Sequence, residues 1–192
     1  MRCGIDASNL VSGGGLNHIK NILHNWKQYN GHINSLVVWA SQALCDQLPI
    51  DKSIELISLP DLNSTPYRRL RWQKNKLPYI AKQECDVIFA PGGIAGHHQI
   101  PLVSMCRNML PFEMREAFRY GISYMLFRIF YLRILQARTF KNSSGVIFLC
   151  DYARDRVMSQ IGDLSCETAL IPHGVQSRFY RQSNPQRKLE SF

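Results

Sequence analysis

The sequence lacks the signatures of several common protein classes. It has no Cys-x-x-Cys pair, no Asp-x-Asp pair and no histidine or carboxylate cluster at ligand spacing, so we predict no metal site and no cofactor. Its six cysteines lie far apart and no secretory signal opens the chain, which predicts free thiols and a cytoplasmic protein. It also contains no internal repeat and no low-complexity segment.

Acidic residues are scarce, since 14 Asp and Glu stand against 23 Lys and Arg, for a formal net charge of +9. This surplus favours an anionic partner, such as a nucleotide, an acidic glycan, nucleic acid or a membrane surface. The basic residues form three loose groups, at 68–76, 115–141 and 178–188. A solvated surface also accounts for any one group. Nucleic acid is the least favoured partner because the sequence contains no nucleic-acid-binding motif.

One stretch, 113–140, is rich in aromatic and aliphatic residues and predicts a single long helix. A membrane-spanning helix needs about 20 apolar residues with few charges. This stretch instead carries Arg119, Arg128, Arg133 and Arg138, and an arginine at mid-bilayer costs about 2.5–3.5 kcal/mol. Two alternatives therefore remain: a helix buried in the protein with its arginine heads in water, or a helix that rests on a membrane surface.

Apolar, strand-like runs alternate with helix-like segments along the chain. The candidate strands are 2–7, 35–40, 54–59, 86–90, 101–106, 145–150 and 167–172. This alternation predicts an α/β fold, a Rossmann-like three-layer sandwich with a mostly parallel sheet, over residues 1–175. The polar and basic residues 176–192 are predicted to form a linker or tail.

Polar and glycine-rich segments follow several of the candidate strands, and parallel sheets bind ligands at those carboxyl ends. The first such segment contains Gly13, Gly14 and Gly15, between a strand and an amphipathic helix. Glycines permit a close approach to the backbone, and the first turn of a helix attracts an anion. A flexible strand-to-helix turn is the alternative interpretation. Similar segments lie at 92–98, 107–108, 150–151 and 173–174.

Four stretches, in this order, resemble the N-terminal domain of a retaining, family-four-type GT-B glycosyltransferase. They are Gly-Ile-Asp-Ala-Ser-Asn-Leu with the later Gly-Gly-Gly-Leu-Asn-His, Asp-Val-Ile-Phe-Ala-Pro-Gly-Gly, Pro-Leu-Val-Ser-Met-Cys-Arg-Asn-Met-Leu-Pro-Phe, and Gly-Val-Ile-Phe-Leu-Cys-Asp-Tyr-Ala-Arg with the later Ile-Pro-His-Gly-Val. The resemblance covers about residues 1–180 and implies the N-terminal half of a GT-B fold.

The resemblance implies a hexosyltransferase that moves a sugar from a nucleotide-sugar donor to a glycan or lipid-linked glycan during cell-surface polysaccharide synthesis. It implies no cofactor besides the donor as co-substrate. It places the donor phosphate at Gly13, Gly14 and Gly15, and a catalytic role at Arg107. The implied acceptor-binding residues are Asn9, His18, Gly93, His97 and Asn108.

The sequence also departs from the family pattern. Arg107 and Asn108 stand where the family has histidine and aspartate, and Cys150 and His173 replace serine and asparagine. A guanidinium cannot act as a base at neutral pH, although it can hold an anion or a hydroxyl group. The resemblance implies a C-terminal nucleotide-sugar domain that this sequence does not include, so we expect either a truncated form or a half-enzyme that needs such a domain on another chain. In both cases we expect the chain to be inactive alone.

The alternative function is a non-catalytic, basic α/β module that binds nucleotides, nucleic acid or a membrane surface. In either case the protein is predicted to lie in the cytoplasm or peripherally on the inner face of the membrane.

Overall fold

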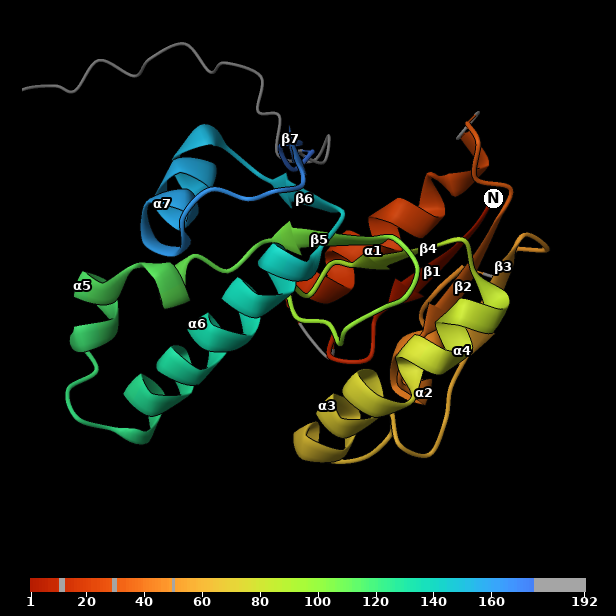
Figure 1. Ribbon diagram of the computed structural model, residues 1–192. Helices are drawn as coiled ribbons and strands as arrows, with labels where there is room; N and C mark the ends of the chain where they lie inside the picture. Colours follow the sequence, from red (N-terminus) through yellow and green to blue (C-terminus); the bar gives the residue numbers. More distant parts are fainter. Residues whose placement is uncertain (11–12, 29–30, 50, 175–192) are drawn as a thin grey trace, which may run out of the picture.

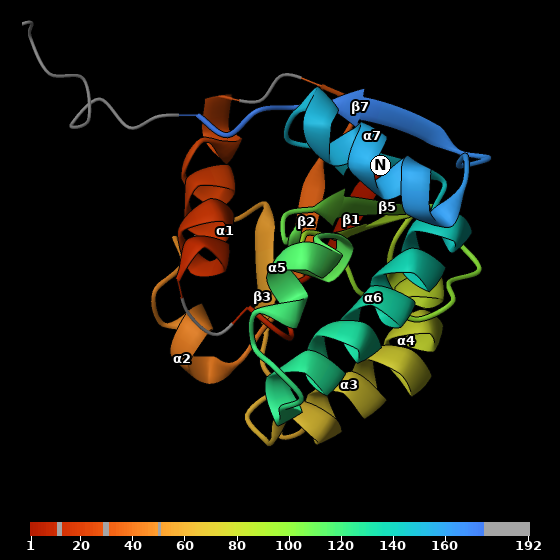
Figure 2. The ribbon, with the colours of Figure 1, turned by 90° about the vertical axis from the view of Figure 1, so that its left-hand side faces the viewer.

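The computed structural model describes residues 1–10, 13–28, 31–49 and 51–174 of the chain. Its centre is a seven-stranded parallel sheet with the order β3-β2-β1-β4-β5-β6-β7, flanked by helices on both faces (Figures 1 and 2). The predicted α/β, Rossmann-like three-layer sandwich is confirmed, and every pair of neighbouring strands is parallel. The predicted tail, 176–192, lies outside the described residues.

The strands are β1 (Arg2–Asp6), β2 (Ser35–Trp39), β3 (Ile54–Ile57), β4 (Val87–Ala90), β5 (Leu102–Cys106), β6 (Gly145–Phe148) and β7 (Glu167–Leu170). The helices are α1 (Gly14–His24), α2 (Gln42–Cys45), α3 (Pro66–Asn75), α4 (Leu77–Glu84), α5 (Met114–Phe118), α6 (Tyr124–Asn142) and α7 (Asp151–Ile161). Two short 3-10 helices are η1 (Trp26–Gln28) and η2 (Leu110–Phe112).

Alternate side chains of β2 build two separate cores, as the two-residue period of a strand requires. Val38 packs under α1, in a cluster that also contains Ile19. Its neighbours Val37 and Trp39 belong to the cluster of the opposite face, with Trp72 of α3. Both faces of the sheet are covered, which is why the strand sequences are continuous apolar runs.

The predicted single helix over 113–140 is wrong. The chain forms α5 and α6 instead, joined by a turn in which Gly121 has a φ of 60°. The Ser123 hydroxyl then caps α6 by accepting a hydrogen bond from the Leu126 N–H at 3.4 Å. None of the helices in the described part of the chain is long and apolar enough to cross a membrane.

One other element boundary differs from the sequence-based interpretation. Helix α1 already begins at Gly14, so Gly14 and Gly15 form its first turn and only Gly13, with a φ of 68°, precedes it. Pro78 lies in the first turn of α4, which follows α3 after a single residue. Proline is tolerated there because the N–H that it lacks would have no helical acceptor.

Candidate functional site

A cleft of about 590 Å³ opens at the carboxyl edge of the sheet. Three segments line it: one face of α1 with the following Asn25, the end of β5 with the following Arg107, and residues 171–174 after β7. The carboxyl edge of a parallel sheet is the usual place for a ligand in this class of fold.

Arg107 is the main charge in this cleft. A Cβ atom on Gly14 or Gly15 would lie 3.7 or 3.5 Å from its terminal guanidinium nitrogens, so the guanidinium rests against the first turn of α1. Its Nε is buried without a hydrogen-bond partner, and no carboxylate of the described residues pairs with it. Burial lowers the pKa of Arg107. The N-terminus of α1, itself partially positive and without acidic residues in its first turn, adds to this potential.

Two histidines meet beside the guanidinium. The rings of His18 and His173 lie with their centroids 4.9 Å apart, edge to face. Burial, then the Arg107 charge, then His173 lower the pKa of His18 to about 4. Burial and Arg107 also lower the pKa of His173. Both imidazoles are therefore neutral at pH 7 and serve as hydrogen-bonding groups, and Nε2 of His18 is buried without a partner in the described structure.

Two asparagines of α1 and Asn25, the residue that caps the helix, form the polar wall of the cleft. Asn17, Asn21 and Asn25 stand at i, i+4 and i+8, so they follow one another along the same face of the helix. The Asn25 amide donates to the Asn21 carbonyl oxygen at 2.8 Å. Each amide group can donate and accept, as ligand hydroxyl groups require.

The chemistry of this cleft suits the binding of an anion that carries hydroxyl groups. It combines a cation, the N–H end of a helix and neutral polar side chains, while its described lining contains no Asp or Glu. His18 is a weak base because its pKa lies near 4. The cleft is thus better equipped to stabilise negative charge than to remove a proton.

Of the residues predicted for the site, Gly14, His18 and Arg107 line the cleft, and Gly13 and Gly15 flank Gly14 at the start of α1. Asn9 lies outside it. Its amide donates to the Gln73 Oε1 at 3.1 Å and belongs to a network around buried Asp6. Asp6 accepts hydrogen bonds from Ser8 and from the Gln73 amide, and burial raises its pKa.

The other predicted residues also lie outside the cleft lining. Gly93 has a φ of 70°, and a Cβ atom there would approach the Met105 carbonyl oxygen to 2.9 Å. The position therefore requires glycine, because its backbone packs closely against the backbone of β5. His97 lines a separate hollow of about 250 Å³ together with Lys74 and Arg138. The Asn108 side chain is engaged locally, because its oxygen accepts from the Leu110 N–H at 3.2 Å.

The predicted site residues did not include the three asparagines, nor His173, although its segment 173–174 was placed at the ligand-binding edge. A usable signal existed for both. His173 directly follows the last strand, at the ligand-binding edge, and the asparagines repeat every four residues on the polar face of α1.

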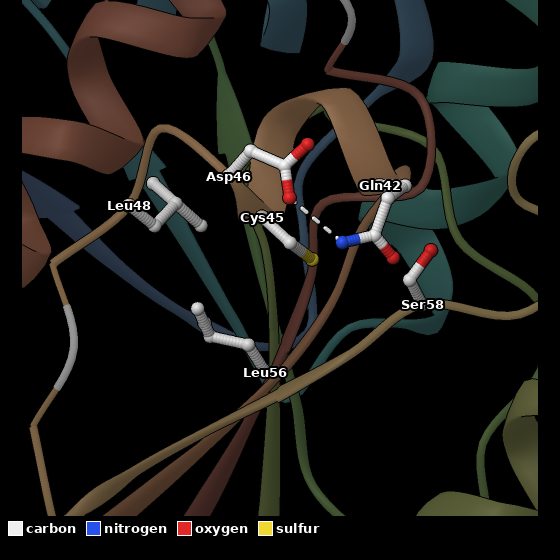
Figure 3. A pocket seen from close by; sticks show the side chains of 6 residues that line it. All are labelled: Gln42, Cys45, Asp46, Leu48, Leu56 and Ser58. Carbon is white, nitrogen blue, oxygen red and sulfur yellow. Dashed lines mark hydrogen bonds between the residues drawn. The ribbon is translucent and has the colours of Figure 1, made fainter.

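A second cavity, of about 440 Å³, lies between α2 and β3 (Figure 3). It is lined by Gln42, Cys45, Asp46, Leu48, Leu56 and Ser58. The Gln42 amide donates to Asp46 at 2.7 Å, so that carboxylate is already engaged. Burial and Asp46 raise the pKa of the Cys45 thiol, which makes it a poor nucleophile. No cation is among the residues that line this cavity, and it does not suit an anionic partner.

Neither a protein-family model nor a curated protein sequence matches the chain. Within the described residues, no group of three or more His, Cys, Asp or Glu is placed to hold a metal ion. The function must therefore be inferred from the chemistry of the cleft and from the sequence motifs.

Proposed function

We propose that the protein is the acceptor-side half of a GT-B glycosyltransferase, and that its cleft receives the phosphates of a nucleotide-sugar donor beside a glycan or lipid-linked acceptor. One observation carries the proposal. The Arg107 guanidinium rests on the glycine-containing first turn of α1 without a carboxylate partner among the described residues. A half-buried cation without such a partner is available to bind an anionic ligand.

The chemistry of sugar transfer matches these groups. When the sugar leaves its nucleotide, negative charge grows on the phosphate oxygen that is released. Arg107 and the first N–H groups of α1 would stabilise that charge. His18 and His173 would act as neutral hydrogen-bonding partners of phosphate or hydroxyl oxygens, and the asparagine row would bind sugar hydroxyl groups.

Arg107 would act in this scheme as an electrostatic group, since a guanidinium does not accept a proton at neutral pH. This agrees with its replacement of the histidine found in the family that the sequence resembles. In that family a second Rossmann-like domain holds the nucleotide across the cleft. On our proposal such a domain, on the same or another polypeptide, completes the enzyme.

The proposal is tested first by calorimetric titration of the chain with uridine and guanosine diphosphates and with the corresponding nucleosides. Binding should require the phosphates. Because a charge-assisted hydrogen bond contributes about 1.5–3 kcal/mol, Arg107→Gln should weaken binding roughly 10- to 150-fold. Arg71→Gln, on the exposed surface of α3, is the matched control and should have little effect.

Equal losses in the two variants, or equal binding of nucleosides and nucleoside diphosphates, would refute the assigned role of Arg107. Transfer itself is measured as release of nucleoside diphosphate from sugar nucleotides, with a C-terminal GT-B domain and glycan or lipid-linked acceptors added. Phosphate-dependent binding without release in any combination would favour the alternative, a non-catalytic nucleotide-binding module.

A further inference from the structure

Large apolar side chains gather on the outside of the α5–α6 hairpin, and we call this surface the hairpin face. Each is at least 37% exposed, and Ile122 reaches 94%. The members are Phe118, Tyr120, Ile122, Tyr124, Met125, Phe127, Phe130, Tyr131 and Ile134. Phe118 and Phe130 meet edge to face with their ring centroids 6.3 Å apart, so the two helices share one aromatic surface.

The exposed residues of α6 have the spacing of a core-facing stripe. Phe127, Phe130, Tyr131 and Ile134 stand at i, i+3, i+4 and i+7, which normally marks the buried side of a helix. The buried side of α6 is a different one, whose members Leu126, Ile129 and Phe140 already fill the core. Helix α6 is therefore apolar on two sides, and one of them lies in water. An exposed apolar area of this kind indicates an interaction site.

The same hairpin is strongly basic. Between residues 114 and 142 the sequence has six Lys and Arg and one acidic residue, Glu116. Glu116 is already paired with Arg119 at 2.8 Å. Arg128 flanks the exposed stripe, and Arg138 continues it one turn beyond Ile134. Aromatic and aliphatic groups framed by arginines are typical of helices that lie in the headgroup region of a membrane.

We propose that the hairpin face docks on an anionic lipid bilayer. Its aromatic side chains would enter the boundary between headgroups and acyl chains, and its arginines would contact lipid phosphates. A second copy of the chain is a poor occupant, because a two-fold contact would bring the same basic surface against itself. The hairpin extends from the body of the domain (Figure 1), a shape that suits a soft, flat partner.

This inference does not depend on the proposed function, because it rests on a different surface. The hairpin follows β5 through η2, so it lies beyond the same carboxyl edge at which the cleft opens (Figure 1). Docking would consequently bring the cleft close to the membrane surface, where a ligand attached to a lipid is accessible.

The test is co-sedimentation of the full chain with vesicles of phosphatidylcholine alone and with vesicles of equal parts phosphatidylcholine and phosphatidylglycerol. The chain should bind the anionic vesicles and not the neutral ones. Arg128→Glu/Arg138→Glu should weaken binding at least 25-fold, since each basic residue near an anionic surface contributes about fivefold. The control Arg68→Glu/Arg71→Glu makes the same change of net charge on α3 and should have a much smaller effect.

The apolar contribution is tested with Phe127→Ala/Tyr131→Ala, whose side chains are 66% and 49% exposed and contribute little to folding. This variant should lose at least tenfold in vesicle binding. The control Tyr67→Ala/Tyr79→Ala removes aromatic rings that are even more exposed, at 73% and 70%, from α3 and α4 and should bind like the wild type. Equal binding to both vesicle types, or equal losses in hairpin and control variants, would overturn the proposal. A dimer that the hairpin variant dissociates would overturn it too.

Discussion

The substitution Gly14→Asp places a negative charge where we expect a ligand phosphate. A Cβ atom at this position would lie 3.7 Å from an Arg107 guanidinium nitrogen, and no other described residue beyond its own helical turn comes within 4 Å of it. The φ of Gly14 is not positive, so a side chain is tolerated without backbone strain. The new carboxylate can therefore reach the guanidinium without displacing its surroundings.

The expected effects on stability and on binding have opposite signs. An acidic residue at a helix N-terminus contributes about 0.3–1 kcal/mol, and an exposed ion pair about 0.2–1 kcal/mol. Their sum, about 1 kcal/mol, should raise the melting temperature by roughly 2–4 °C for a domain of this size. The same carboxylate neutralises Arg107 and repels phosphate, so nucleoside diphosphate binding should weaken roughly 10- to 150-fold.

Thermal unfolding and calorimetric titration measure the two effects on one protein preparation. Gly14→Asn is the control, because it has nearly the same shape and no charge. It should retain most of the binding. A Gly14→Asp variant that binds nucleoside diphosphates as tightly as the wild type would refute the assignment of the phosphate site. Reduced thermal stability would refute the inference that the Arg107 charge is uncompensated.

Two further predictions concern stability. Gly93→Ala should destabilise the fold by about 1–3 kcal/mol more than Gly121→Ala, as measured by urea unfolding. Both glycines have a positive φ, but of the two only Gly93 would bring its Cβ against a backbone atom, at 2.9 Å. Equal effects would contradict this reasoning. Burial is the main cause that lowers the pKa of His18 and of His98 to about 4. These rings therefore stay neutral in the folded state down to about pH 4. The same histidines in the unfolded chain take up protons from about pH 6.5 downwards. Stability should therefore fall as the pH drops from about 6.5 to 4, and a replacement of both histidines by glutamine should flatten that slope.

The strands were predictable because a parallel sheet buried on both faces needs apolar residues at nearly every position. The run at 145–150 contains β6, and the run at 101–106 contains β5. The predicted strands are one or two residues longer than the observed ones, since the hydrogen-bonded ladder covers only part of each apolar run. Sheet order follows from packing between distant segments and was not predictable.

The division of the 113–140 stretch was missed for a physical reason. Its turn depends on the left-handed conformation of Gly121 and on the cap at Ser123, while the flanking residues all favour a helix. Because α6 is apolar on two sides, periodicity did not reveal which side is buried. The sequence left open whether this helix is buried in the protein or rests on a membrane surface. In the structure one side of α6 is buried and another apolar side is exposed.

The predicted site residues fall into two groups: those with a structural role through local contacts, and those available to a ligand. The rule that ligands bind at strand carboxyl ends selected Arg107, Gly93 and Asn108 alike. Gly93 is required by a close backbone crossing, and the Asn108 side chain accepts from a neighbouring N–H. Arg107 has no such local engagement among the described residues. Only the three-dimensional contacts distinguish a polar residue with a structural role from one that is available to a ligand.

The cleft and the hairpin face are joined through a rigid connection. Arg107 and the hairpin both follow β5, and η2 lies between them. Helix α7 fixes this connection: the Gln160 amide donates to the Phe112 carbonyl oxygen, and the Tyr152 hydroxyl donates to Glu113 at 2.5 Å. Phe112 is fully buried. These contacts hold the segment between Arg107 and the hairpin against α7, so membrane docking would keep the cleft near the bilayer surface.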